Sequence, residues 1–108
     1  MIQQILARDL AEKLAAGTPV YLIDVRQSWE NATAALAGGV LIPLNELQRR
    51  IEEVAPPSGA MVVTYCHHGV RSLTAAGILE RNGFEQVYSL AGGIDAWSRE
   101  VDAGIPRY

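Results

Sequence analysis

Three short apolar runs divide the chain, and each is bounded by glycine, proline or polar residues. They cover residues 20–23, 61–65 and 87–90. Short runs rich in β-branched and aromatic side chains are typical of strands that are buried on both faces. Weaker strand candidates lie at 4–5 and 40–41. The pattern therefore predicts a sheet of about five strands.

Helical patterns fill the intervals between these runs. Apolar side chains recur at spacings of three and four within residues 10–15 and 44–54. Residues 71–82 are rich in Ala and Leu, and Gly83 with Phe84 supplies the usual helix stop. A last helix is expected over 94–101, after a Gly-Gly turn. Alternation of strands and helices indicates an α/β fold, in which helices flank both faces of a central parallel sheet.

Size and charge narrow the class of protein further. A chain of 108 residues with 49% hydrophobic residues fits one domain, residues 1–108, without a linker. The net charge is −3, and basic residues form no stripe, so nucleic acid is not expected as a partner. No segment approaches the roughly 18 apolar residues that cross a bilayer. Charged residues interrupt the first 16 positions, which therefore lack the apolar stretch of a secretory signal. We expect a cytoplasmic protein without membrane association.

Two chemically active side chains directly follow predicted strands. Asp24 comes after the first apolar run and Cys66 after the second. The carboxyl ends of parallel strands meet at one edge of a sheet, so we expect both side chains at the same rim. A single cysteine cannot form an internal disulfide, and the two adjacent histidines fall short of a closed zinc site. Cys66 is therefore expected to be a free thiol, with no metal and no cofactor.

The residues after Cys66 predict an anion-binding loop. His67, His68, Gly69 and Val70 form a short turn before Arg71 and Ser72 open a helix. Such a turn can fold its amides into a nest around the sulfur, and the helix dipole adds positive charge. This setting favours a thiolate or a terminal persulfide. Gly69 permits the required backbone angles, and Arg71 offers a cationic fork for an oxyanion. A lone cysteine is commonly a small buried hydrophobe, but its position here favours a reactive thiol.

The loop 66–72 resembles the Cys-x-x-Gly-x-Arg-Ser signature of the rhodanese family of thiosulfate sulfurtransferases. Further similar segments occur in the family's order along the chain: Leu22-Ile23-Asp24-Val25-Arg26 with Trp29-Glu30, Gly38-Gly39-Val40-Leu41-Ile42-Pro43, and Leu90-Ala91-Gly92-Gly93 with Trp97. The resemblance implies a rhodanese-like fold. It also implies that Cys66 accepts sulfur and that residues 67–71 bind the substrate anion. Asp24 and Arg26 match a family pair that is more often structural.

Two details of the resemblance bear on function. Ala35 stands where the family usually has histidine, which puts a polar contact or a partner contact in question more than catalysis. Four residues separate Cys66 from Arg71. Cysteine phosphatases and arsenate reductases of similar fold have one residue more in this loop, which accommodates a tetrahedral oxyanion. The shorter loop therefore disfavours phosphatase activity.

Other residues have simpler interpretations. His67 and His68 are expected to face solvent or substrate, and adjacent histidines are expected to point in different directions, which argues against joint metal chelation with Cys66. Ser72 is expected either to donate to the sulfur or to cap the helix, with capping favoured. We expect Arg26 to form an ion pair. Core packing is expected for Trp29 and Trp97, and a solvated surface for Arg49-Arg50 and Glu52-Glu53.

Together these features predict a sulfurtransferase. It would move sulfane sulfur from thiosulfate or a similar donor to cyanide or a thiol through a Cys66 persulfide, without a cofactor. The alternative is a sulfur-relay or regulatory module that docks a protein partner without turning over small molecules. A protein persulfide could serve as donor in that case.

Overall fold

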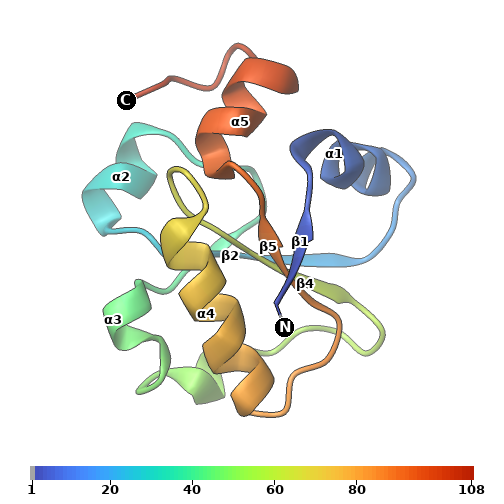
Figure 1. Cartoon of the computed structure of the whole chain (residues 1–108), viewed down its shortest axis with the longest axis vertical. Helices are drawn as coiled ribbons and strands as arrows, with labels where there is room; N and C mark the ends of the chain where they lie inside the picture. Colours follow the sequence, from blue (N-terminus) through green and yellow to red (C-terminus); the bar gives the residue numbers. More distant parts are fainter. Residues whose placement is uncertain (1) are drawn as a thin grey trace.

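The computed structural model describes residues 2–108, which contain one parallel sheet of five strands (Figure 1). The strands are β1 (Gln3–Ile5), β2 (Val20–Asp24), β3 (Val40–Leu41), β4 (Met61–Tyr65) and β5 (Val87–Leu90). Their order across the sheet is β1-β5-β4-β2-β3, and every pair is parallel. All five predicted strands are confirmed, the two weaker ones included.

Helices cover both faces of the sheet, as the alternation of elements predicts. They are α1 (Ala7–Ala15), α2 (Ser28–Thr33), α3 (Leu44–Leu47), the 3₁₀ turn η1 (Ile51–Glu53), α4 (Val70–Arg81) and α5 (Gly93–Glu100). One apolar cluster lies against α1 and α5, and a second lies against α3 and α4. Within residues 2–108, no helix is long and apolar enough to cross a membrane.

The predicted end of α4 is confirmed in atomic detail. The amide of Gly83 donates to the carbonyl of Glu80 (3.0 Å), and the amide of Phe84 donates to that of Leu79 (3.1 Å). Gly83 has φ +90°. This pair of bonds satisfies helix carbonyls that would otherwise lack donors, and it requires a left-handed residue at the glycine position. The stop signal therefore works as the sequence indicates.

Two expectations about helices and aromatic residues need correction. The helical pattern of residues 44–54 breaks into α3 and η1 at Arg50, whose angles (φ −103°, ψ 21°) leave the helical range. Helix α2 was not predicted, although Gln27 and Glu30 form a capping box at its start. This short helix presents Trp29 to solvent, with 62% of its surface exposed, so its expected core position is wrong. Trp97 is 9% exposed and packs in the core as expected.

Asp24 and Cys66 both lie at the carboxyl-end rim of the sheet, as expected, but their side chains project from opposite faces. Asp24 is in register with Tyr65 across the β2–β4 pair, and side chains in register share a face. Tyr65 packs in the cluster against α1 and α5, whereas Cys66 packs in the cluster against α3 and α4. Strand alternation thus separates two side chains that follow neighbouring strands.

Arg26 forms the expected ion pair and is fully buried. Its Nε and Nη2 atoms donate to the two carboxylate oxygens of Asp24 at 2.8 and 2.7 Å. Nη2 also donates to the carbonyl of Ala34 (2.6 Å), and Nη1 donates to the hydroxyl of Tyr108 (2.7 Å). A buried charge costs several kcal/mol unless it is paired and fully hydrogen-bonded, and this guanidinium meets both conditions.

Arg26→Lys should destabilise the protein by at least about 2 kcal/mol, because an ammonium keeps the charge but cannot reproduce the planar fork. Arg50→Lys is the matched control, since Arg50 pairs with Glu46 and Glu53 in partly exposed positions. That change should cost less than about 1 kcal/mol. Urea unfolding of both variants measures the difference, and equal losses would contradict the importance assigned to the buried fork.

Candidate active site

Cys66 lies directly after β4, and the loop that follows wraps around its sulfur. The amide of Gly69 donates to Sγ at 3.1 Å, and the amide of Ser72 donates to it at 3.3 Å. The residue is 1% exposed. Gly69 has φ +101° and occupies the N-cap position of α4, which lets the chain turn back over the sulfur. Two backbone donors and a helix N-terminus thus favour negative charge on this atom.

Ser72 contacts the sulfur instead of capping the helix, which corrects the sequence-based expectation. It lies in the first turn of α4, and no side-chain cap bond is formed there. Its Oγ lies 3.6 Å from Sγ of Cys66 and 2.7 Å from Oγ of Ser89 on β5. Both serines are fully buried. Sequence reasoning missed Ser89, because a polar residue inside an apolar strand gives no sign of what it touches.

Helix α5 holds the loop in place from the other side. The amides of Ile94 and Asp95 donate to the carbonyls of Cys66 (2.9 Å) and His67 (3.1 Å). A Cβ atom at Gly93 would collide with both carbonyl oxygens, and Gly93 also has φ +62°. The Gly-Gly turn expected before the last helix therefore has a physical role, since it lets the helix approach the cysteine loop closely.

Arg71, which the sequence suggested as a cationic fork for an oxyanion, is paired with a carboxylate of the protein. Its Nη1 and Nη2 atoms donate to the two oxygens of Glu30 at 2.7 and 2.9 Å. Glu30 is buried at the start of α2. The guanidinium beside it lowers the pKa of the Glu30 carboxyl to about 2, so the pair is charged at neutral pH. Sequence reasoning did not identify this partner.

Tyr108 reaches the same site from the segment after α5, whose path back beside α2 is visible in Figure 1. Its hydroxyl donates to Glu30 (2.8 Å) and accepts from Arg26 (2.7 Å). Its ring stacks on His67, with 3.9 Å between centroids, and meets Trp29 edge-on at 5.9 Å. Burial raises the pKa of the Tyr108 phenol. No sequence signal pointed to this residue.

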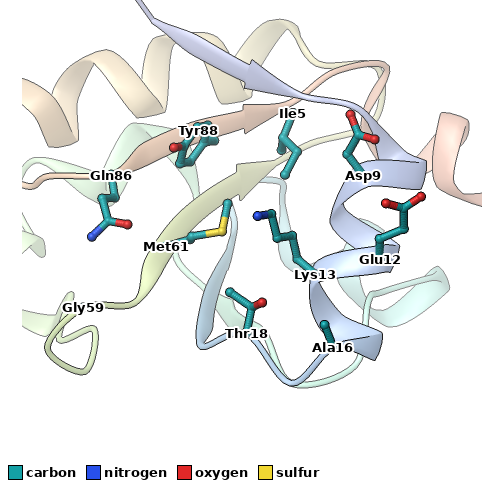
Figure 2. Close-up of a pocket in the computed structure, with 10 residues that line it drawn as sticks. All are labelled: Ile5, Asp9, Glu12, Lys13, Ala16, Thr18, Gly59, Met61, Gln86 and Tyr88. Carbon is teal, nitrogen blue, oxygen red and sulfur yellow. The ribbon is translucent and has the colours of Figure 1, made fainter.

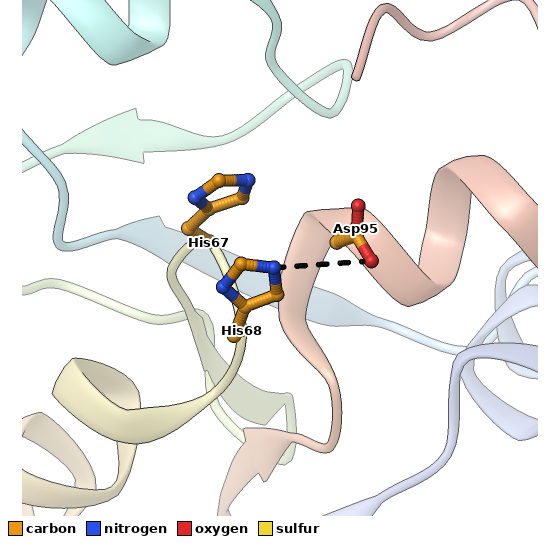
Figure 3. Close-up of side chains that lie close together, drawn as sticks. All are labelled: His67, His68 and Asp95. Carbon is orange, nitrogen blue, oxygen red and sulfur yellow. Dashed lines mark ion pairs between the residues drawn. The ribbon is translucent and has the colours of Figure 1, made fainter. Parts of the chain in front are cut away.

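His67 and His68 stack on each other, so the expectation that they point in different directions is wrong. Their ring centroids lie 3.9 Å apart at an interplanar angle of 25°. His68 is exposed, as expected, and its Nε2 lies 3.9 Å from Oδ2 of Asp95 (Figure 3). His67 is partly buried, and desolvation lowers the pKa of its imidazole. Both rings therefore line the entrance to the cysteine loop.

The two histidines and Asp95 offer ligand atoms within 4.8 Å of one another, and Cys66 is not part of this group. Asp95 already accepts hydrogen bonds from Arg99 and Arg107, each at 3.0 Å. These guanidinium groups lower the pKa of the Asp95 carboxyl, with Arg107 as the larger influence. Two adjacent cations compete with a metal ion, so the cluster fits an ion-pair network better than a metal centre.

A cavity of some size lies away from the cysteine loop. It has a volume of about 680 Å³ and lies between α1 and the amino ends of β4 and β5, where Met61 and Gln86 line it (Figure 2). Lys13 and Asp9 project toward it from α1. Since Cys66 follows the carboxyl end of β4, cavity and sulfur lie at opposite ends of that strand.

The structure thus combines a parallel α/β fold with a cysteine held between a strand and the first turn of a helix. A family model described as "Rhodanese-like domain" matches residues 6–100. The chain belongs to the rhodanese-like family.

Relatives and solved structures agree with this assignment. A "Sulfurtransferase" from Allochromatium vinosum is 33% identical over 98% of this chain and 94% of its own length. "Adenylyltransferase and sulfurtransferase uba4" from Ogataea parapolymorpha is 32% identical over 90% of this chain, but the match covers 25% of that protein. A "Rhodanese-like Domain Protein" from Staphylococcus aureus superposes with TM-score 0.82 at 27% identity, covering 99% of both chains. The rhodanese-like fold and a transferase of sulfur are thus supported.

Gly93→Ala should destabilise the protein by at least about 3 kcal/mol, because the new Cβ forces α5 away from the loop carbonyls. Gly83→Ala is the control, since Gly83 also has positive φ but open space around the missing Cβ. It should cost only about 1 kcal/mol. Urea unfolding distinguishes the two, and a similar cost for both would show that the close approach of α5 is unimportant.

Glu30 should make the protein sensitive to acid. Its carboxyl pKa is about 2 in the folded state, below the ordinary value of 4.5. The resulting stability, at most about 3 kcal/mol, is present above the unfolded pKa and is lost as pH falls through the folded value. Unfolding measured between pH 5 and pH 2 should show this loss, which Glu30→Gln should lack. Glu80→Gln, at an exposed site, should retain it.

Proposed function

We propose that the protein is a sulfurtransferase that carries sulfane sulfur on Cys66, taking it from thiosulfate or a similar donor and passing it to cyanide or a thiol. The observation that carries this proposal is the pair of amide hydrogen bonds from Gly69 and Ser72 to Sγ. Backbone donors fixed at the reacting atom need no rearrangement when charge develops there. Family membership supports the same class of reaction.

The first half-reaction loads the cysteine. The Cys66 thiolate attacks the outer sulfur of thiosulfate, a new S–S bond forms, and the bond to the sulfonate sulfur breaks. Sulfite leaves with the electron pair, and Cys66 holds a persulfide. The loop residues His67, His68, Gly69, Val70 and Arg71 surround the bound sulfur and its donor. Backbone N–H groups in the first turn of α4 lack intrahelical acceptors, so they are available to donate to the added sulfur.

The second half-reaction returns the thiolate. Cyanide attacks the terminal sulfur through carbon, the persulfide S–S bond breaks, and thiocyanate departs. The electron pair of the broken bond returns to Sγ, so the cycle is balanced without a redox cofactor. Ser72 contacts the sulfur with both its amide and its hydroxyl. Asp24 and Arg26 act as positioning residues, because they touch the loop only through Tyr108 and Glu30.

A second candidate function is sulfur relay, in which a protein persulfide supplies or receives the sulfur. The match to one quarter of an adenylyltransferase and sulfurtransferase shows that such domains occur within larger sulfur-handling proteins. Two apolar side chains lie exposed here, Val70 in the loop and Trp29 on α2. Faster transfer from a protein persulfide than from thiosulfate would favour relay over turnover of small molecules.

Cys66→Ser should abolish sulfur transfer from thiosulfate to cyanide, lowering turnover by at least about 10³-fold, because the hydroxyl cannot hold sulfane sulfur. Intact mass after exposure to thiosulfate should show one added sulfur atom on the wild type and none on the variant. Glu80→Gln serves as a control with an unaltered loop. No turnover and no adduct in the wild type would contradict the proposal. The sulfur-relay or regulatory module that docks a protein partner would then be the favoured function.

A further inference from the structure

Every arginine around the cysteine loop is paired with a carboxylate within the described residues. The pairs are Arg71 with Glu30, Arg26 with Asp24, and both Arg99 and Arg107 with Asp95. Arg71 is the one that belongs to the cysteine loop itself, directly before Ser72, whose amide bonds the sulfur. Its side chain is 35% exposed, so it faces the entrance with its positive charge already offset.

Glu30 is held in this pair from several sides. Besides the two bonds from Arg71, it accepts hydrogen bonds from the Tyr108 hydroxyl (2.8 Å) and from the amide of Gln27 (3.1 Å). Its side chain is almost fully buried. A carboxylate with four donors cannot turn away from Arg71 without losing several bonds at once. An incoming anion must therefore compete with Glu30 for the guanidinium.

Aromatic rings border the same ion pair. Tyr108 stacks on His67 and meets the edge of Trp29, which is itself exposed. Such faces suit the carbon-rich part of a ligand better than a small hydrated dianion. The entrance thus combines an offset charge with apolar surface.

We propose that Glu30, held by Tyr108, is a specificity-determining residue that selects organic persulfides (R–S–SH) over thiosulfate as sulfur donors. The proposal rests on the sulfur transfer proposed for Cys66. Thiosulfate brings a sulfonate directly beside the transferred sulfur, so this second negative charge must compete with the buried Glu30 carboxylate for the Arg71 guanidinium. An organic persulfide brings an alkyl group to that position. Like charges repel strongly where water is partly excluded, so the two donors differ in how well they reach the sulfur.

The loading step with an organic persulfide is balanced in the same way. The Cys66 thiolate attacks the terminal sulfur of R–S–SH, a new S–S bond forms, and the original S–S bond breaks. The leaving thiolate R–S⁻ takes the electron pair, and the proton stays on the terminal sulfur or passes to water. No sulfonate is present at any stage. Glu30 acts through Arg71 and is a positioning residue, not a catalytic one.

The test compares two donors, thiosulfate and the persulfide of β-mercaptoethanol, with cyanide as acceptor for both. Glu30→Gln should raise the ratio of kcat/KM for thiosulfate to kcat/KM for the persulfide about tenfold, because Arg71 becomes free to bind the sulfonate. Glu53→Gln is the matched control. It removes the same negative charge from the Arg50–Glu53 ion pair, which lies at η1 and outside the cysteine loop. This change should leave the ratio within about twofold of wild type.

Tyr108→Phe provides a second variant if Glu30→Gln folds poorly. It removes one hydrogen bond from Glu30 while keeping the ring that stacks on His67, and it should raise the ratio by a smaller factor. A ratio that stays at the Glu53→Gln level or falls in both variants would overturn the role of Glu30. If neither donor loads sulfur onto wild-type Cys66, sulfur transfer itself fails, which is a distinguishable result.

Discussion

The buried guanidinium of Arg26 is the interaction on which the arrangement of the site depends. It joins the carboxyl end of β2, through Asp24, to the carbonyl of Ala34 after α2 and to Tyr108 at the end of the described chain. A buried guanidinium is costly unless its N–H groups are hydrogen-bonded, so the position of each of these segments is fixed by the acceptor that it supplies. Within the short helix α2 only Glu30 is buried, and the tail meets the core through Ile105 and Tyr108. The cation fixes both of them beside the cysteine loop.

Contacts from two sides hold the cysteine loop in place, and both involve residues outside the loop. On one side, hydrogen bonds run from Arg26 to Tyr108, from Tyr108 to Glu30 and from Arg71 to Glu30. They connect the buried Arg26–Asp24 ion pair to the first turn of α4. On the other side the N-terminus of α5 bonds the loop carbonyls, which is possible only because Gly93 has no side chain. Fixed carbonyls leave the loop amides directed toward the sulfur. The electrostatic environment of Cys66 is therefore set before any donor arrives.

Local patterns in the sequence predict the elements and the cysteine loop, because strand runs, helix stops and a glycine at a tight turn depend on neighbouring residues. The five strands and the end of α4 follow from such signals. Glu30 and Tyr108 could not be predicted, since they meet their partners across 41 and 78 positions of the chain. The rim position of Asp24 was predicted correctly, but the strand pattern alone did not show that Asp24 and Cys66 lie on opposite faces of the sheet. Ser72 failed as a cap because Gly69 takes that position.

The site combines two electrostatic features: one favours negative charge on the sulfur, and the other offers little to a second anionic group. The amides of Gly69 and Ser72 favour negative charge on the sulfur itself, and they act at about 3 Å on whichever sulfur species occupies Cys66. The Arg71–Glu30 pair lies further out and presents both signs of charge, so it offers little to a second anionic group. A thiolate or a persulfide with one charge on sulfur satisfies the inner feature without disturbing the outer one. In the proposed selection, a donor with a further charge beside its sulfur competes with Glu30 for Arg71, and this competition would link the buried network to the choice of donor.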